Sequence, residues 1–462
     1  MDFTIGKATD GTKPKREWVY AKKPSGKLYR YRQWVGYTLL LFLAIAPLVH
    51  IKGEPLLLLN IVDRKFVILG SVFWPQDLYI FVFGMLIFMV FVVLFTVVWG
   101  RVWCGWTCPQ TVFMELVFRR IEYWIEGDWQ QQKRLNKAKG TTEWYVKKAA
   151  KHTIFLAISF MIANLFLSYI IGAKQLWQIV TDPVGQHIGG LIAISLFTLV
   201  FYAVFAFVRE IVCTTICPYG RLQGVLLDDK SITVAYNQQR GEPRGPRRKD
   251  TAQHFGDCVD CGLCVHVCPT GIDIRNGVQM ECVNCTACID ACDAVMDKVG
   301  KPRKLVGFYT VGETEGKPVK KEGNTRVIAY SAVLVLLLAV FGWLLFSRSE
   351  VDGTLLRAKG STYQLRDNGT VTNLYSLELI NKGHGDMPFT LVSEDSRFSV
   401  QLVNPVREVA KGGTAQLSFF LVCAKQEVTA YKTDVKIAVQ TSDGRVVETM
   451  KTTFVSPPGR GN

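Results

Sequence analysis

The sequence predicts a multidomain membrane protein that contains a five-helix transmembrane bundle, a small cysteine-rich module and a C-terminal β-sandwich. Three observations support this fold class. Apolar residues gather in long blocks instead of being spread evenly along the 462-residue chain. Twelve of the thirteen cysteines fall in four short groups. The C-terminal part shows short alternating apolar runs that are separated by turn residues.

Five apolar stretches are long enough to cross a hydrocarbon core of about 30 Å, which takes roughly 20 helical residues. They cover about residues 34–51, 78–99, 153–172, 188–208 and 327–346. A basic tail of residues 1–33 precedes the first stretch and is too long for the charged region of a signal peptide. No small-residue cleavage pattern follows that stretch, so we expect an uncleaved anchor.

The charges beside these spans predict their orientation. Lys and Arg crowd the tail 1–33, the loop 101–152 and the segment 209–326, whereas the loop 173–187 carries only Lys174. Because basic regions stay on the cytoplasmic side of a bacterial inner membrane, these three regions are expected in the cytoplasm. The net charge of +15 is then explained by the orientation of the chain in the membrane, and we expect no nucleic-acid partner.

The same argument predicts the domain order. Four spans lie between residues 34 and 208, and the segment 209–326 holds a cytoplasmic ferredoxin-like module at about 250–310. The fifth span, 327–346, exports the rest of the chain to the periplasm.

The segment 351–462 is expected to form an immunoglobulin-like (Ig-like) β-sandwich. Its alternating runs are Thr372–Ile380, Phe398–Val403, Ala415–Val422 and Thr433–Gln440. Cys423 stands in an apolar stretch, where a core position is expected. His384 and Met387 lie in a glycine-rich loop, and a loop role is favoured over a copper contact because two soft ligands alone make a weak site.

Eight cysteines form a doubled motif, C-x2-C-x2-C-x3-C, that begins at Cys258 and again at Cys282. Bacterial two-cluster ferredoxins have this spacing, and in them the fourth cysteine of each run ligates the other cluster. We therefore predict two 4Fe-4S clusters. The first is held by Cys258, Cys261, Cys264 and Cys292, and the second by Cys282, Cys285, Cys288 and Cys268.

Zinc sites and disulfides are the alternatives for these eight cysteines. Zinc takes four ligands in paired C-x2-C units instead of interleaved quartets, and disulfides are disfavoured in the reducing cytoplasm. Between the two runs, Asn276-Gly277 is flanked by Ile272–Arg275 and Val278–Glu281, which predicts a β-hairpin.

The other four grouped cysteines form two C-x3-C-P units, Cys104 and Cys108 after the second span and Cys213 and Cys217 after the fourth. If the helix continues through a unit, both sulfurs lie on one helix face. Alternatively, the prolines begin new helices, and the helix dipole stabilises the thiolate before them. Either geometry suits copper(I), disulfide exchange or electron relay, whereas the plainer alternative is a buried small apolar residue.

These motifs together resemble the FixG/RdxA family of cytochrome c oxidase accessory proteins, also called CcoG. The resemblance runs from the basic tail through both C-x3-C-P units and the doubled cysteine run to the β-sandwich tail. The membrane half is also similar to the polyferredoxin subunits of periplasmic nitrate and nitrous oxide reductase systems, which lack that tail.

The resemblance implies reduction of copper(II) to copper(I) during assembly of cbb-type cytochrome c oxidase. Copper is then the substrate, and the implied partners are membrane lipid, oxidase assembly factors or copper carriers, and an electron donor that the sequence does not identify. Cys104, Cys108, Cys213 and Cys217 become candidates for handling copper or passing electrons.

Two other functions remain open from the sequence. One is an electron relay between the quinone pool and another redox partner, as in the polyferredoxin relatives. The other is a non-catalytic assembly scaffold whose clusters are structural. No phosphate-binding glycine loop or dinucleotide fingerprint occurs in a suitable context, so we expect no bound nucleotide.

Overall fold

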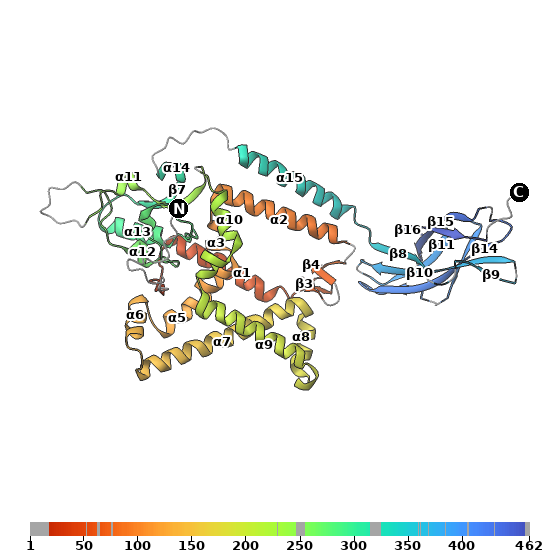
Figure 1. Ribbon diagram of the computed structural model, residues 1–462, viewed down its shortest axis with the longest axis horizontal. Coiled ribbons are helices and arrows are strands. Elements are labelled where there is room, and N and C mark those ends of the chain that lie inside the picture. The colour runs from red at the N-terminus through yellow and green to blue at the C-terminus, as the bar shows by residue number, and fades with distance from the viewer. Residues whose placement is uncertain are drawn as a thin grey trace, which may run out of the picture. The chain divides into compact units, whose positions relative to one another are not determined.

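The computed structural model describes residues 18–457 except 52, 62–64, 75–76, 229, 246–254, 315–324, 359, 361, 368, 384, 404–405 and 429. The basic tail up to residue 17 and the predicted loop residue His384 therefore lie outside the described residues. The chain divides into two compact units, which Figure 1 traces from red to blue. The first comprises Met1–Val49, Leu57–Asp63 and Phe81–Ala339, and the second His50–Leu56, Arg64–Ile80 and Val340–Asn462.

Four helices of the described chain are long and apolar enough to cross a membrane (Figure 1). They are α2 (Leu78–Trp99), α7 (Thr142–Ile171), α9 (Ile188–Ala203), which continues as the π-helical stretch η4 (Val204–Val208), and α15 (Thr325–Phe346). Large apolar side chains such as Phe88, Leu199 and Leu336 are exposed on them. Exposed apolar surface on helices of this length is the surface that lipid covers.

The predicted count of five spans is not confirmed, because the first predicted span does not appear among these four. Residues 34–51 correspond in part to α1, which runs from Lys27 to Ile45. Lys27, Arg30 and Arg32 occupy its first two turns, so only the part from Trp34 onward is apolar. Pro47 follows the helix and cannot continue it.

The loop 101–152 is mostly helical. Its elements are α3 (Val102–Trp106), α4 (Pro109–Val112), the π-helical η2 (Phe113–Phe118), α5 (Arg119–Ile125) and α6 (Trp129–Lys137). Phe118 packs this loop onto the membrane helices: its ring stacks on Phe205 of η4 at 4.6 Å between centroids and meets Phe155 of α7 edge-on at 4.9 Å. The loop helices are therefore part of the same apolar core as α7 and η4.

Short helices connect the remaining membrane segments of the first unit. After α7 come α8 (Ala173–Thr181) and the 3-10 helix η3 (Val184–Gln186), and after η4 come η5 (Val212–Ile216) and α10 (Pro218–Leu226). The helices α7 and α9 pack against each other.

The cysteine-rich module folds around one pair of antiparallel strands. β6 (Ile232–Tyr236) pairs with β7 (Val306–Thr310), and Val234 and Val306 contribute to a buried core with Ile289 and Met296. Its helices are α11 (Gln238–Gly241), α12 (Leu263–His266), η6 (Ile274–Asn276), α13 (Ala287–Lys298) and α14 (Val311–Thr314). β6 precedes the first cysteine run and β7 follows the second. Their pairing therefore joins the two ends of the cysteine-rich module.

The β-hairpin predicted around Asn276-Gly277 is wrong. Residues Ile274–Asn276 form the short 3-10 helix η6, and Val278–Glu281 is not a strand. The Asp273 side chain accepts a hydrogen bond from the backbone N–H of Arg275 at 3.0 Å, which starts the helical turn. Such local side-chain bonds offer the backbone an alternative to a strand ladder.

The module also holds the start of the first helix. The carboxylate of Asp290 in α13 accepts hydrogen bonds from the backbone N–H groups of Leu28 at 3.2 Å and Tyr29 at 2.8 Å. Ahead of them, the N–H of Lys22 donates to the carbonyl of His266 at 2.7 Å. A residue 261 positions beyond Tyr29 in the sequence thus supplies the N-terminal cap of α1, since α1 has no side-chain cap of its own.

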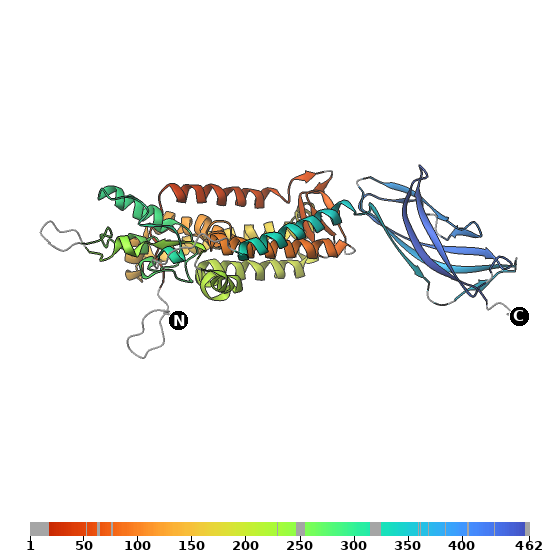
Figure 2. The ribbon, with the colours of Figure 1, turned by 90° about the horizontal axis from the view of Figure 1, so that it is seen from above.

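The C-terminal domain is a two-sheet β-sandwich, whose long twisted strands are drawn in blue in Figure 2. One sheet has the order β12-β14-β10-β8, with β9 at the edge of β10, and the other β13-β11-β15-β16. Tyr375, Phe419 and Phe454 are fully buried in its core, and Cys423 is buried there as expected. The four predicted runs correspond to β10, β12, β14 and β15.

The strands of the second unit have the following bounds. β8 to β12 are Val351–Arg357, Gln364–Leu365, Thr370–Asn381, Met387–Ser393 and Phe398–Leu402. β13 to β16 are Glu408–Val409, Thr414–Ala424, Lys432–Thr441 and Val446–Val455. Ahead of them, β1 (His50–Ile51) pairs with β2 (Glu54–Pro55), and β4 (Lys65–Ile68) pairs with β5 (Ser71–Phe73). One further strand of the chain, β3 (Leu57–Asn60), belongs to the first unit.

Candidate metal centre

The two cysteine runs have the same backbone conformation. Asp260 and Asn284, each two residues after the first cysteine of a run, both have a φ of 52°. Gly262 and Thr286 follow at matched positions, both with a φ of 65°, and each precedes a helix. A positive φ is uncommon for asparagine and costly for β-branched threonine, so this geometry is imposed by the loop. Both runs therefore fold into the same kind of loop.

Each cysteine quartet predicted from the spacing lines one cavity. The first cavity is lined by Cys258, Cys261, Cys264 and Cys292. The second is lined by Cys268, Cys282, Cys285 and Cys288, and Cys264 reaches its wall as well. In each quartet, the structure brings three cysteines of one run together with the fourth cysteine of the other.

The donor set fits iron–sulfur clusters and not single metal ions. Among the described residues, no three His, Cys, Asp or Glu side chains converge closely enough to hold one ion. Sulfur atoms that surround a space are instead what a cluster of several irons requires. Burial raises the pKa of Cys282 and Cys292 to about 12, so these thiols need a bound cation to be thiolates at neutral pH.

At the first cavity, the arginine in the wall is paired with carboxylates, and one of the four cysteines is exposed to solvent. Arg275 lines it, and its guanidinium pairs with Asp273 at 2.7 Å and also with Asp260. Cys261 is exposed to solvent. The positive charge beside this quartet is thus matched by two carboxylates.

The second cavity is more deeply buried. Cys285 is 7% exposed, and Arg32 of α1 and Arg101, which follows α2, are 3% and 5% exposed. Arg32 Nε donates to the carbonyl of Gly105 at 2.7 Å, and Arg101 donates to the carbonyl of Gly220. Both arginines therefore donate a hydrogen bond to a backbone carbonyl in or next to a C-x3-C-P unit.

Of the two geometries open for the C-x3-C-P units, the structure has the one in which proline begins a helix. Cys108 and Cys217 are the residues just before α4 and α10, with Pro109 and Pro218 at the first helical positions. Their backbone angles match, with φ/ψ of −58°/126° and −68°/115°. The two units are therefore structural repeats as well as sequence repeats.

The prediction of dipole-stabilised thiolates concerns Cys108 and Cys217, which precede the prolines, and not Cys104 and Cys213. Burial, reinforced by the neighbouring thiol of Cys108, raises the pKa of Cys104 and Cys213 to about 12. Cys104 Sγ lies 3.3 Å from Gln223 Oε1, to which it donates a hydrogen bond. Both cysteines precede the helix starts by a turn or more, so the dipole of α4 or α10 does not reach them.

The two C-x3-C-P units meet the wall of the second cavity. Cys104 and Cys213 pack against a buried cluster that contains Val283, Cys285 and Ala287, together with Cys288. Gly105 makes this approach possible, because a Cβ at that position would overlap the carbonyl oxygen of Val283 and lie 3.0 Å from Cys285 Cα. The structure thus joins the four grouped cysteine motifs into one continuous region.

Relatives of the chain identify its family. Protein RdxB of Cereibacter sphaeroides is 37% identical to it over 391 residues, which cover 80% of each chain. The chain belongs to the FixG/RdxA family. Protein RdxA of the same organism is 34% identical over 396 residues, 82% of each chain. Nitrogen fixation protein FixG of Rhizobium meliloti is 32% identical over 412 residues, 79% of this chain and 77% of FixG.

Three domain families match parts of this FixG/RdxA chain. A 4Fe-4S dicluster domain matches residues 208–311, a 4Fe-4S binding domain matches residues 81–130, and the Ig-like fold at the C-terminus of FixG matches residues 341–457. These matches confirm an iron–sulfur protein with an Ig-like domain. Together with the four apolar helices, they indicate a membrane protein that transfers electrons.

A third cavity of this FixG/RdxA chain is lined in part by Cys213. The loop that follows Cys268 forms one wall with Pro269 and Thr270, and the membrane-proximal helices form the other with Gln110, Thr111, Met114, Glu115, Arg119, Arg209 and Glu210. The sequence did not reveal this cavity, because its walls come from four distant segments.

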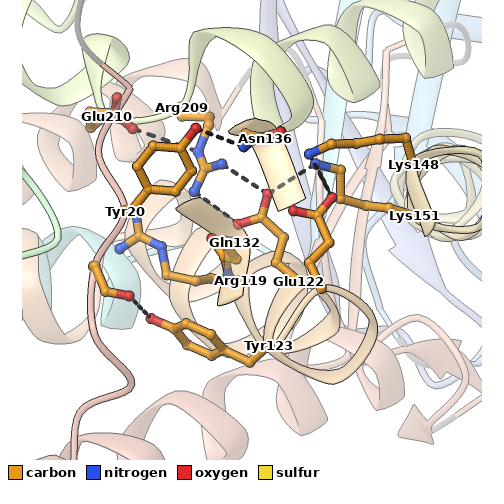
Figure 3. A network of polar contacts seen from close by, with 12 residues as sticks. Tyr20, Arg119, Glu122, Tyr123, Gln132, Asn136, Lys148, Lys151, Arg209 and Glu210 are labelled. Carbon is orange, nitrogen blue, oxygen red and sulfur yellow. Dashed lines mark hydrogen bonds and ion pairs between the residues drawn. The ribbon is translucent and has the colours of Figure 1, made fainter. Parts of the chain in front are cut away.

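Sequence reasoning also missed a buried ionic network in the FixG/RdxA chain, shown in Figure 3. Arg209 forms two hydrogen bonds with Glu122 of α5, at 2.8 and 3.0 Å. Lys151 and Lys148 of α7 pair with Glu126 at 2.9 and 2.8 Å. These residues belong to the basic regions that predicted orientation, and their periodicity gave no sign that they are buried.

Proposed function

We propose that this chain reduces copper(II) to copper(I) at the cytoplasmic face of a bacterial inner membrane, as a step in assembly of a cbb-type oxidase. One observation carries the proposal: Cys104 and Cys213 pack against the buried cluster that contains Cys285, one of the cysteines that line the second cavity. Soft thiol sulfur prefers copper(I) to copper(II), so it favours the reduced product. An electron store and a copper-binding group are then neighbours in one protein.

We assign the cluster ligands as the interleaved spacing predicts. Cys258, Cys261, Cys264 and Cys292 hold one 4Fe-4S cluster, and Cys268, Cys282, Cys285 and Cys288 hold the other. When bound, each cluster supplies storage for a single electron. The cavity that each quartet lines supports this assignment.

The juxtamembrane cysteines have the substrate role in this proposal. Cys104, Cys108, Cys213 and Cys217 receive copper(II), each copper ion takes up one electron, and copper(I) leaves on a copper carrier or an oxidase assembly factor. Burial keeps Cys104 and Cys213 protonated, so copper must displace a proton from each thiol that it binds.

We further propose that α1 crosses the membrane as a fifth helix. Its first turn is held by Asp290 of the cysteine-rich module, and α2 ends just before Gly105, which contacts the same module. The chain must therefore travel away from the module before α2 brings it back. At about 1.5 Å per residue, the apolar part of α1 from Trp34 to Ile45 rises about 18 Å, and its basic first two turns lie outside the hydrocarbon core.

Five crossings support the sidedness expected from the charges. The N-terminus and the cysteine-rich module then face the cytoplasm, and the Ig-like domain faces the periplasm, where it is available to an assembly partner.

The test is reduction of copper(II) by pre-reduced, full-length protein. Protein purified anaerobically in detergent is assayed for iron and sulfide, reduced, freed of excess reductant and mixed with copper(II) and a copper(I)-specific chelator. The expected result is about two chelated copper(I) ions per chain. The visible absorbance of the clusters, which reduction bleaches, is expected to return as copper(I) forms. No copper(I) from protein with full iron and sulfide content would reject the proposal.

Cysteine variants test the role of the C-x3-C-P units. Replacing Cys213 and Cys217 with serine is expected to slow copper(I) formation at least tenfold while iron and sulfide content stays unchanged. The matched control is Cys423→Ala, which removes a buried cysteine of the Ig-like domain and is expected to leave the rate unchanged.

The cavity beside Cys213 favours a second candidate, an electron relay that exchanges electrons with a quinone. Its walls join residues next to Cys268 and Val283 to the membrane-proximal helix η2, so a small organic ring there would lie between lipid and clusters. Reoxidation of the reduced protein by a water-soluble quinone analogue, with no requirement for copper, would support the relay instead. If neither oxidant reacts, a scaffold whose clusters are structural becomes the better description.

A further inference from the structure

We propose that Arg32 and Arg101 raise the reduction potential of the cluster in the second cavity above that of the cluster in the first. Electrons held by this chain then collect beside Cys104 and Cys213. The inference rests on the proposed function, because it requires that both quartets hold clusters.

Arg101 carries a buried positive charge that has no ion-pair partner among the residues that the structure describes. Its side chain is 5% exposed, and its hydrogen bond goes to the neutral carbonyl of Gly220. Its Nε has no hydrogen-bond partner among the described residues. The groups that act on it most strongly are Cys104 and Cys282, and the carboxylate of Glu281 acts more weakly.

Arg32 is a second buried arginine near the second cavity, and it belongs to a different element, α1. Its Nε donates to the carbonyl of Gly105 at 2.7 Å, and its Nη1 has no hydrogen-bond partner within the described part of the chain. The backbone of Gly105 lies against Cys285, so the Arg32 guanidinium lies close to that cysteine, whereas the Glu115 carboxylate acts on the Cys285 thiol more weakly and in the opposite direction. Two buried guanidinium groups therefore flank one quartet.

The first cavity provides the contrast. Its arginine, Arg275, is paired with Asp273 and Asp260, so the local charge is close to neutral or negative. Its cysteine Cys261 is exposed, and water screens charge there. The two cavities thus have equivalent ligands but different charges around them.

This difference has a direct consequence for reduction. Adding one electron makes a cluster more negative by one charge, and a nearby buried cation stabilises that state. When one electron passes from the first cluster to the second, the first is oxidised and the second reduced, with no proton or atom transferred. The buried arginines make this direction favourable.

The test is a redox titration of full-length protein, followed by electron paramagnetic resonance, after iron and sulfide have been measured. Wild type is expected to show two midpoint potentials. In Arg101→Gln and in Arg32→Gln, the higher potential is expected to fall while the lower one stays. The matched control is Arg303→Gln, which removes an exposed arginine of the same module that is paired with Asp297 and is expected to move neither potential.

Arg101→Lys separates charge from shape, because it keeps the positive charge and is expected to retain a higher potential than Arg101→Gln. Glutamine variants with full iron and sulfide content and an unmoved higher potential would overturn the inference, as would an equal fall of both potentials. If Arg101→Gln loses its iron, Arg32→Gln alone decides. Wild-type protein that lacks about eight irons would instead reject the proposed function.

Discussion

Single residues of the ionic network show how a charge is kept in the interior of this protein. Glu122 and Arg209 are 3% and 2% exposed, and both terminal nitrogens of Arg209 donate to the Glu122 carboxylate in a two-pronged pair. Although burial opposes ionisation, Arg209, Lys151 and Arg119 hold the pKa of Glu122 below its usual range. Arg209 also stacks over Trp18 at 4.6 Å, so the pair ties the N-terminal segment to the end of η4.

The variant Glu122→Gln is expected to destabilise the protein by about 3–5 kcal/mol, because it leaves the Arg209 charge buried without its partner. Thermal unfolding in detergent, at pH 7 and at lower pH, measures the loss. The folded pKa lies below the unfolded value of about 4.3, so the contribution of Glu122 is fully present above that pH. It is lost as the pH falls through the folded pKa, and the difference between variant and wild type is expected to shrink there.

Glu143→Gln is the control for this prediction. Glu143 pairs with Lys147 one turn along α7, but its side chain is 69% exposed, and exposed pairs contribute little. An equal loss of stability in both variants, or a difference that does not change with acidification, would contradict the role given to Glu122.

At the scale of elements, the contact between α3 and the second cysteine loop depends on one missing side chain. Gly105 is buried, and its φ is not in the left-handed region. Glycine is therefore needed at this position because a side chain would not fit, and not because of the backbone conformation. The carbonyl of Val283 and the Cα of Cys285 occupy the volume that a Cβ would take. Both partners are backbone atoms and cannot rotate away.

Gly105→Ala is therefore expected to push α3 from the loop at a cost of about 1–3 kcal/mol. The expected readout is a loss of up to half of the iron and sulfide, because only the second quartet is disturbed. Gly190→Ala is the control, since nothing lies within 4 Å of a Cβ at that position of α9. Full iron content in Gly105→Ala would mean that the loop tolerates the displacement.

The elements also show which features follow from sequence. Spacing was sufficient to predict that each quartet lines one cavity, because a cluster needs a fixed number of residues between ligands, but not that Cys264 lines both cavities. The hairpin was wrong because Asp273 forms bonds with its own neighbours, and turn residues alone do not reveal such competition. The burial of Arg32 and Arg101 was also hidden, because it depends on packing between α1, α3 and the module.

At the scale of the whole molecule, the order of membrane crossings decides where each domain works. The charge distribution predicted that order, and the apolar blocks predicted four helices that the structure contains. The first helix was placed too far along the chain, since its basic start is held by the module instead of lying outside it. Periodicity and charge cannot report such a contact between distant segments.

Reporter fusions measure the sidedness directly. Alkaline phosphatase fused to the end of the full chain is expected to be active, because that enzyme matures only in the periplasm. The same reporter fused after Thr314, before α15, is expected to be inactive, and a fluorescent protein fused there is expected to fluoresce. The opposite pattern would place the cysteine-rich module in the periplasm and exclude the proposed encounter with cytoplasmic copper.

The bond between Asp290 and the start of α1 has a consequence for biosynthesis. Helix α1 leaves the ribosome long before Asp290 is translated, so its first turn emerges without the carboxylate that satisfies Leu28 and Tyr29. That turn can be completed only after the module has folded, and the module folds around the cysteines that take up iron. The first helix of the described chain is thus completed only after residue 290 has been synthesised and has reached its place in the module.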